Sequence, residues 1–213
     1  LDHRHIYDLT AGLIAAGAEC AAHDPVTSDP RVLAGFRRRF PDVPALDRAV
    51  LVQPSVYGTD NTAMLDAMKV AGKSFRGVSV VADDISEAEL KRLHDAGVRG
   101  VRVNIVDVPN RKPGTLPMDA LKKLAQKVKP FGWHMEFLAH VDEFPDLDNM
   151  LDGFPVDTVY GHLGYMKTDK GIAHPGFQAL LRLMKAGKAW VKLTGPYRIS
   201  LQTMPHADTD VYA

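Results

Sequence analysis

Short apolar runs, rich in β-branched residues, alternate along the chain with longer stretches of helical periodicity. The apolar runs predict strands at residues 49–53, 77–81, 100–105, 133–139, 158–160 and 189–193. The stretches between them predict helices near residues 63–71, 86–94, 117–129, 146–151 and 175–186. Apolar strands separated by helices of this length are typical of βαβ units, in which a parallel sheet is buried on both faces.

More specific signals mark one helix and the start of the chain. Ser86 with Glu89 three residues later forms a capping box, which predicts the start of a helix, and Gly97 ends that helix. Residues 5–7 predict a further strand, the first of seven. Residues 8–44 are harder to interpret: two helices are expected near 9–22 and 29–40, and the arginine triplet in the second is interpreted as a solvated helix end.

Seven strands in one direction leave two architectures, an open doubly wound sheet or a barrel. No G-x-G-x-x-G motif follows any strand, which disfavours a nucleotide-binding open sheet. Polar residues instead stand at the carboxyl ends of many strands: His3, His5, Gln53, Ser55, Arg102, Asn104, His140, His162, Lys192 and Thr194. Because barrel active sites have this pattern, we predict an α/β fold of the (β/α)8 TIM-barrel type, in a single domain over residues 1–213.

Composition and charge narrow the function classes. Of 213 residues, 46% are hydrophobic and 24% are charged, as in a globular protein with a core. The 26 basic and 26 acidic residues cancel, so no overall field favours nucleic acid or an anionic membrane as a partner. The single cysteine, Cys20, excludes an intrachain disulfide. Since the chain also has no membrane-length apolar run and no signal-peptide pattern, the cytoplasm is the expected location.

Four histidines are candidates for chemistry. His3 and His5 point to the same side of the first predicted strand, where paired imidazoles can bind a divalent metal or polarise a carbonyl; a frayed chain end is the competing interpretation. His162 lies between two glycines, Gly161 and Gly164, and either faces a ligand or is a turn residue held by the backbone. His140 is expected near His162, with capping of the segment that follows it as the alternative.

Two arginines are candidates for binding anions. Arg102 and Asn104 share one face of an otherwise apolar strand, because they are two residues apart. A buried arginine needs an anion, which is either a protein carboxylate or the carboxylate of a ligand. Arg198 follows the last predicted strand and is either a second carboxylate-binding residue or a surface arginine.

Four segments carry a family resemblance: residues 48–61 (RAVLVQPSVYGTDN), 96–104 (AGVRGVRVN), 131–134 (FGWH) and 191–200 (VKLTGPYRIS). In their order and spacing they resemble the 2-pyrone-4,6-dicarboxylate lactonase group of the amidohydrolase superfamily. The resemblance implies that His3, His5 and His162 polarise a lactone carbonyl, directly or through a metal. It also implies that Arg102 and Arg198 bind substrate carboxylates.

The chain departs from that group at several places. Gly161 and Tyr165 stand where the group has an aspartate and an arginine beside its strand-six histidine. The group's last strand carries a W-G-T-D-W-P-H motif that supplies a general-base aspartate, and this motif is absent. Neither Asp208 nor Asp210 is assigned to that role. The expectation is therefore a barrel without strand 8 and the helix that follows it.

The principal prediction is a hydrolase that opens a lactone of a carboxylated small metabolite by attack of water. The expected catalytic residues are His3, His5 and His162, and the expected substrate-binding residues are Ser55, Tyr57, Arg102, Asn104, His140 and Arg198. His3 and His5 are also the candidate ligands of a divalent metal such as zinc, with a metal-free site left equally open. Two alternatives are an inactive truncated barrel, which binds a small anionic ligand or needs a partner chain, and an amidohydrolase-type decarboxylase. A homo-oligomer is left open.

Overall fold

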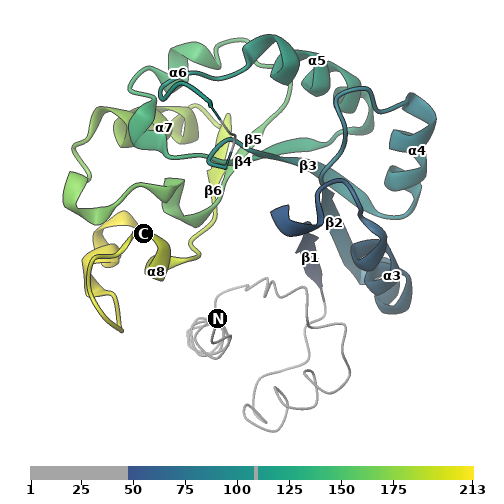
Figure 1. Cartoon of the computed structure of the whole chain (residues 1–213), viewed down its shortest axis with the longest axis horizontal. Coiled ribbons are helices and arrows are strands. Elements are labelled where there is room, and N and C mark those ends of the chain that lie inside the picture. Colours follow the sequence, from purple (N-terminus) through teal and green to yellow (C-terminus); the bar gives the residue numbers. More distant parts are fainter. Residues whose placement is uncertain (1–47, 108–109) are drawn as a thin grey trace, which may run out of the picture. The chain divides into compact units, whose positions relative to one another are not determined.

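Six strands lie in one sheet in the order in which they occur along the chain (Figure 1). The structure is a computed structural model that describes residues 48–107 and 110–213. The strands are β1 (Ala49–Val52), β2 (Phe75–Ser79), β3 (Val98–Asn104), β4 (His134–Leu138), β5 (Thr158–Tyr160) and β6 (Ala189–Val191). β1 pairs in parallel with β2, and β4 pairs in parallel with both β3 and β5; β5 and β6 are also parallel. The α/β fold with a parallel sheet is confirmed.

Helices connect the strands. They are α3 (Thr62–Ala71), α4 (Glu87–Asp95), α5 (Met118–Val128), α6 (Leu147–Met150), α7 (Pro175–Lys185) and α8 (Pro196–Ile199). Short 3-10 helices are η1 (Ser55–Tyr57), η2 (Gly72–Ser74), η3 (Lys129–Phe131), η4 (Val141–Glu143), η5 (His162–Tyr165), η6 (Thr168–Lys170) and η7 (Ala207–Tyr212). Within residues 48–107 and 110–213, no helix is both long and apolar enough to cross a membrane.

Most predicted element boundaries agree with the structure to within two residues. The capping box is present, because the Glu89 main-chain N–H donates to Ser86 Oγ at 3.2 Å. The strand predicted at 77–81 begins two residues earlier, since Phe75 and Arg76 already pair with β1. α8 was not predicted. The strand predicted at 5–7 and the helices predicted near 9–22 and 29–40 lie outside the described residues.

The described chain forms two compact units. The first comprises residues 48–80 and 91–99, and the second comprises the remaining described residues, within 81–90 and 100–213. In the first unit, α3 packs closely on β2 at Gly77, where a Cβ atom would lie 2.8 Å from the Met68 sulfur. Gly77 therefore permits this helix to approach the strand.

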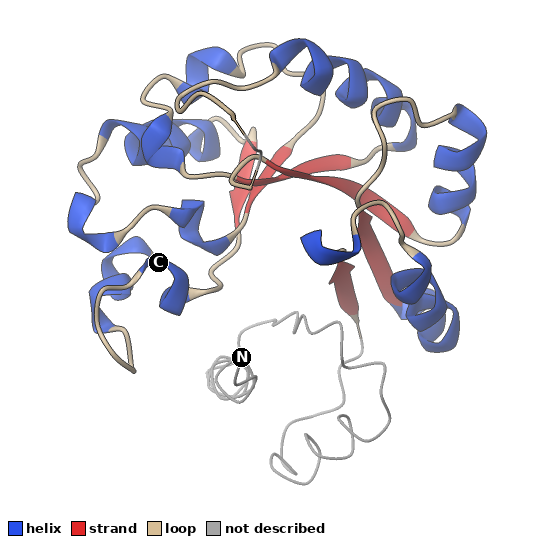
Figure 2. Ribbon diagram, viewed as in Figure 1, coloured by secondary structure: helices blue, strands red, loops and turns tan. Residues whose placement is uncertain are grey.

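In the second unit, α5, α6 and α7 lie on one side of β4, β5 and β6 (Figure 2). The packing buries Val128, Met135 and Leu180 completely. Each buried side chain of this size contributes about 1.5–3 kcal/mol to folding. This apolar layer supports the strands whose polar ends form the candidate site.

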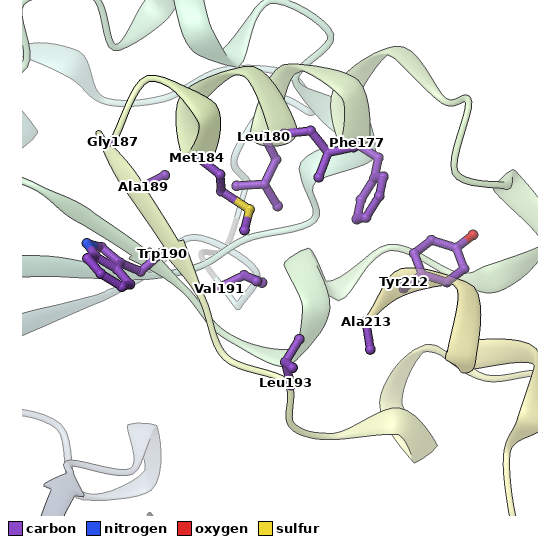
Figure 3. A pocket seen from close by; sticks show the side chains of 11 residues that line it. Phe177, Leu180, Met184, Gly187, Ala189, Trp190, Val191, Leu193, Tyr212 and Ala213 are labelled. Atoms are coloured by element: carbon purple, nitrogen blue, oxygen red, sulfur yellow. The ribbon is translucent and has the colours of Figure 1, made fainter. Parts of the chain in front are cut away.

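An apolar groove, here called the α7–β6 groove, lies between α7, β6 and the C-terminal η7 (Figure 3). Its volume is about 490 Å³, and Phe177, Val191 and Leu193 are among the residues that line it. Trp190 also lines the groove and is 66% exposed, whereas Trp133, the other tryptophan of the chain, is 2% exposed. Within the described residues, β6 thus has a partly uncovered apolar surface.

Candidate active site

Charged side chains gather on one face of β3 to β6. Arg102 of β3 is in register with Glu136 of β4. The register continues from Glu136 through Val159 to Trp190 of β6. Residues in register point to the same side of a sheet, and alternate residues of a strand share a face. Lys192, two residues after Trp190, therefore lies on the same face as Arg102 and Glu136.

A buried carboxylate joins two cations on this face. Glu136 Oε1 lies 2.6 Å from Lys192 Nζ and 3.9 Å from Arg102 Nε. The Glu136 side chain is 5% exposed, against 12% for Arg102 and 33% for Lys192. Burial lowers the pKa of Arg102, and the Glu136 charge opposes that shift. The protein carboxylate that the sequence analysis considered for Arg102 is therefore present, but Lys192 is its closer partner.

His162 lies against the turn that follows β6. Its Nδ1 is 3.2 Å from Thr194 Oγ1. Gly195 has a φ of +67°, and a Cβ atom there would collide with the His162 ring, so the turn needs glycine for the imidazole to occupy this place. Burial, together with the positive charges around it, lowers the pKa of His162 to about 4. The imidazole is therefore neutral at neutral pH.

Residues 162–165 form an unusual run of backbone in the left-handed region, with φ values of 52°, 54°, 79° and 54°. Non-glycine residues pay roughly 1–3 kcal/mol for such conformations, which persist only where the surroundings hold them. Two contacts hold this run. The Leu163 main-chain N–H donates to the Lys192 carbonyl at 3.1 Å, and Gly164 packs so closely on Val141 that a Cβ atom would lie 2.9 Å from it.

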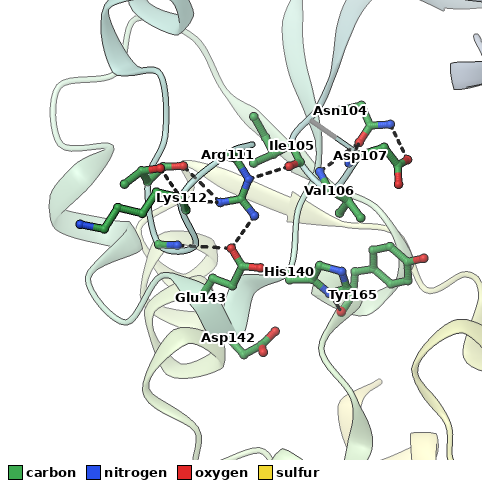
Figure 4. A network of polar contacts seen from close by, with 12 residues as sticks. Asn104, Ile105, Val106, Asp107, Arg111, Lys112, His140, Asp142, Glu143 and Tyr165 are labelled. Atoms are coloured by element: carbon green, nitrogen blue, oxygen red, sulfur yellow. Dashed lines mark hydrogen bonds and ion pairs between the residues drawn. The ribbon is translucent and has the colours of Figure 1, made fainter. Parts of the chain in front are cut away.

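The Tyr165 ring contacts both candidate histidines of the second unit. It stacks on His140, with ring centroids 4.6 Å apart and an interplanar angle of 14° (Figure 4). It meets His162 edge-on, at 5.7 Å and 63°. His140 Nδ1 lies 2.7 Å from the Tyr165 carbonyl oxygen, which can only accept, so Nδ1 carries a hydrogen. The His140 side chain makes no capping bond to η4.

Arg198 approaches this aromatic group from α8. Its Nη1 lies 3.5 Å from the Tyr165 hydroxyl oxygen, and its guanidinium lies 5.4 Å from the centre of the Tyr197 ring. The Arg198 side chain is exposed, and its charge acts on both Arg102 and His162. The two candidate carboxylate-binding arginines therefore lie within electrostatic reach of one another.

Two polar side chains shape the loop after β3 (Figure 4). Asn104 Oδ1 accepts from the main-chain N–H groups of Val106 and Asp107, at 3.0 and 3.1 Å. Arg111 Nη2 lies 2.5 Å from Glu143 Oε2 and thereby ties the loop to η4. These contacts give Asn104 a structural task, and its substrate-binding role stays a prediction.

The other predicted residues lie outside this cluster. Ser55 and Tyr57 belong to the first unit, where both are exposed in η1 directly after β1. The buried Gln53 fixes that loop by donating from Nε2 to the Asp60 carbonyl at 2.5 Å. His3 and His5 lie outside the described residues. The proposed roles of all four stay predictions.

The described part of the site offers few ligands for a divalent metal. Across residues 48–107 and 110–213, no group of three or more His, Cys, Asp or Glu side chains could hold an ion. The charges that act on His162 are those of Lys192, Arg198 and Arg102, which would repel a divalent cation. The described residues by themselves therefore form no such metal site, and the metal-binding role of His3 and His5, which lie outside them, stays a prediction.

Sequence reasoning missed Glu136 and Tyr165. The signal for Glu136 was available: a carboxylate in an otherwise apolar strand needs a partner for the same reason that Arg102 does. No equivalent signal existed for Tyr165, because its position depends on a left-handed backbone at three non-glycine residues. Lys192 and Thr194 were recognised only as polar residues at the end of a strand.

Asp208, which was not assigned as a general base, is held by several donors. Its carboxylate accepts from the Ser200 and Thr168 hydroxyls, both at 2.5 Å, and from the Leu201 main-chain N–H at 3.1 Å. These bonds fasten the C-terminal segment to η6 and to the segment after α8. Asp208 therefore has a structural role.

Comparisons with known proteins agree with the resemblance seen in the sequence. The family model described as Amidohydrolase matches residues 6–213. The chain is 37% identical over 155 residues to the 2-pyrone-4,6-dicarboxylate hydrolase of Comamonas testosteroni, which covers 72% of this chain and 50% of that protein. It is 28% identical over 163 residues to the 4-sulfomuconolactone hydrolase of Hydrogenophaga intermedia, with 76% and 53% covered. The chain thus spans about half the length of these curated relatives.

One solved structure is similar over most of the chain. It is described as a probable 2-pyrone-4,6-dicarboxylic acid hydrolase from Acinetobacter baumannii with citric acid bound. The TM-score is 0.68 at 27% sequence identity, and the match covers 85% of this chain and 64% of that one.

Proposed function

This chain belongs to the amidohydrolase family, and from that premise we propose that it opens a carboxylated lactone by attack of water. The observation that carries the proposal is the arrangement of Arg102, Lys192 and Arg198 around a neutral His162. Three cations with one closely held carboxylate, Glu136, favour an anionic ligand. The names of the relatives, which are lactone hydrolases, and the citric acid in the Acinetobacter structure support the same ligand class.

We place β1 to β6 as consecutive strands of a (β/α)8 barrel within a single domain. The parallel pairing and the sequential strand order support this placement, because the strands of such a barrel follow one another around it. In a barrel the site lies at the carboxyl ends of the strands. Arg102, His162 and Thr194 stand at such ends, as do Ser55 and Tyr57 in the first unit.

In the proposed reaction, Arg102 and Arg198 bind carboxylates of the substrate by charge-assisted hydrogen bonds. We assign the Thr194 hydroxyl as the donor across its 3.2 Å contact with His162 Nδ1, which leaves the single ring hydrogen on Nε2. From there it can donate to the lactone carbonyl oxygen as negative charge develops on it. Lys192, held by Glu136, adds positive charge at the same place.

The attacking water needs a general base, which typically contributes 10²–10⁴-fold to the rate. Glu136 is engaged by Lys192, and Asp208 is engaged by hydroxyl groups, so neither is proposed as the base. We expect the base to be a carboxylate outside the described cluster. The proposal also includes substrate contacts from Ser55, Tyr57, Asn104 and His140, and a part in the reaction for His3 and His5. It further includes a cytoplasmic location and a homo-oligomer.

The test is hydrolysis of 2-pyrone-4,6-dicarboxylate, followed by the loss of pyrone absorbance and by product analysis. The assay should use purified protein. Lys170→Met is the control variant, because Lys170 pairs with Asp142 and belongs to none of the residues proposed for the reaction. Both proteins should release the ring-opened acid at the same rate. Binding without turnover would support an inactive binding protein instead, and release of CO2 would support a decarboxylase.

A further inference from the structure

Tyr165 stands where His140, His162 and Arg198 meet. One face of its ring is stacked on His140, and its edge faces His162. Its carbonyl oxygen is bound by His140, and its backbone is held at a φ of 54°. The surroundings therefore fix this side chain at an energetic cost, a combination that is common at functional sites.

The hydroxyl of Tyr165 is suited to receive a ligand. A phenol can accept and also donate one hydrogen bond. As Arg198 Nη1 is the donor toward the Tyr165 oxygen, the hydroxyl hydrogen is left for an acceptor beyond that pair. Their separation of 3.5 Å is long for a direct bond, and a carboxylate oxygen could accept from both groups at once.

We propose that Tyr165 is a specificity-determining residue that binds, together with Arg198, one carboxylate group of the lactone. The assignment rests on the proposed function, since it concerns the same site. A neutral donor beside Arg198 adds direction without a second charge, so the pair selects a single carboxylate in a fixed orientation. The second carboxylate is proposed for Arg102, whose charge also acts on His162.

The assignment can be tested by binding, without any reaction. Isophthalate carries two carboxylates on a flat six-membered ring, and isophthalamide has the same shape without charge. Calorimetric titration should show that Tyr165→Phe raises the Kd for isophthalate about tenfold, as expected for loss of one hydrogen bond to a charged group. The Kd for isophthalamide should not change. Tyr197→Phe is the matched comparison, because Tyr197 contacts Arg198 through its ring and through a side-chain hydrogen bond; it should raise the Kd for isophthalate less than Tyr165→Phe does.

A double-mutant cycle with Arg198→Gln asks whether the two residues share one carboxylate. If they do, Tyr165→Phe should cost less than about threefold in the Arg198→Gln background. A full tenfold loss in that background overturns the proposal. The proposal is also overturned if Tyr165→Phe binds isophthalate as tightly as the parent does, or if it weakens the binding of isophthalate and isophthalamide equally. It is overturned as well if the parent protein does not bind isophthalate. Unfolding midpoints of all variants show whether any loss is merely structural.

Turnover separates this proposal from the proposed function. If isophthalate binding depends on Tyr165 while 2-pyrone-4,6-dicarboxylate is not hydrolysed, lactone hydrolysis is wrong and the carboxylate assignment stands. If the pyrone is hydrolysed and Tyr165→Phe leaves its KM unchanged, lactone hydrolysis stands and the assignment of Tyr165 is wrong.

Discussion

The two faces of β6 and of the residues that follow it, up to Thr194, carry side chains with different tasks. On one face, Lys192 binds Glu136 and Thr194 contacts His162. On the other, Val191 and Leu193 line the α7–β6 groove. A strand sends alternate side chains to opposite sides, so the four residues 191–194 can serve chemistry and packing at once. The comparison teaches that changes on the groove face should act on stability alone, whereas changes on the charged face should act on ligand binding, on the buried ion pair, or on both.

The largest effect is expected on the groove face. Phe177 is 5% exposed and meets Tyr212 edge-on at 5.1 Å. Phe177→Ala should lower the free energy of unfolding by about 3 kcal/mol, at the low end for a buried phenylalanine because the groove admits water on one side. Urea denaturation measures this. Leu181→Ala, on the same helix but 38% exposed, should cost less than about 1 kcal/mol. Weaker isophthalate binding in folded Phe177→Ala would break the division between the faces.

Next comes the buried ion pair on the charged face. Lys192→Met leaves Glu136 buried with Arg102 as the more distant cation, and should destabilise the fold by about 2 kcal/mol. The value is below that of a fully buried pair because Lys192 is one-third exposed. Arg182→Met, which breaks the surface pair with Asp148, should cost less than about 1 kcal/mol in the same denaturation experiment. Adding Glu136→Gln to Lys192→Met should restore part of the loss; no recovery would mean that charge burial is not the cause.

Arg102 should affect ligand binding more than folding. Arg102→Met should weaken isophthalate binding at least about tenfold while the protein remains folded, since Glu136 keeps its closer partner Lys192. Calorimetry and circular dichroism measure the two properties. Unchanged affinity would show that Arg102 serves only Glu136.

The smallest effect concerns pH. In the folded protein the pKa of His162 is about 4, below its ordinary 6.5. Where the unfolded histidine is protonated and the folded one is not, folding is penalised, so stability should fall as the pH drops from about 6.5 towards about 4. His162→Asn, in which Asn tolerates the left-handed backbone, should lose about 1 kcal/mol less than the parent between about pH 7.5 and about pH 5.8. Identical pH profiles would show that His162 is not desolvated.

Periodicity was enough to predict the strands of the sheet, because an apolar run bounded by turn residues has few other stable arrangements. Arg102 was found by a burial argument, which applied equally to Glu136 and would have paired the two. The meeting of His140, His162 and Tyr165 was less accessible. It depends on four consecutive left-handed residues, and among them only Gly164 favours that conformation by its own chemistry.

The exposed Trp190 makes the edge of β6 optically visible, on the face that also carries Lys192. With Trp133 buried, the two tryptophans of the chain should emit as separable populations, one blue and shielded, the other red and open to acrylamide. Any segment or second molecule that covers this face at the edge of β6 would shift and protect only the red population. Quenching at several protein concentrations would then distinguish cover by the same chain from cover by a second copy, since only the latter depends on concentration.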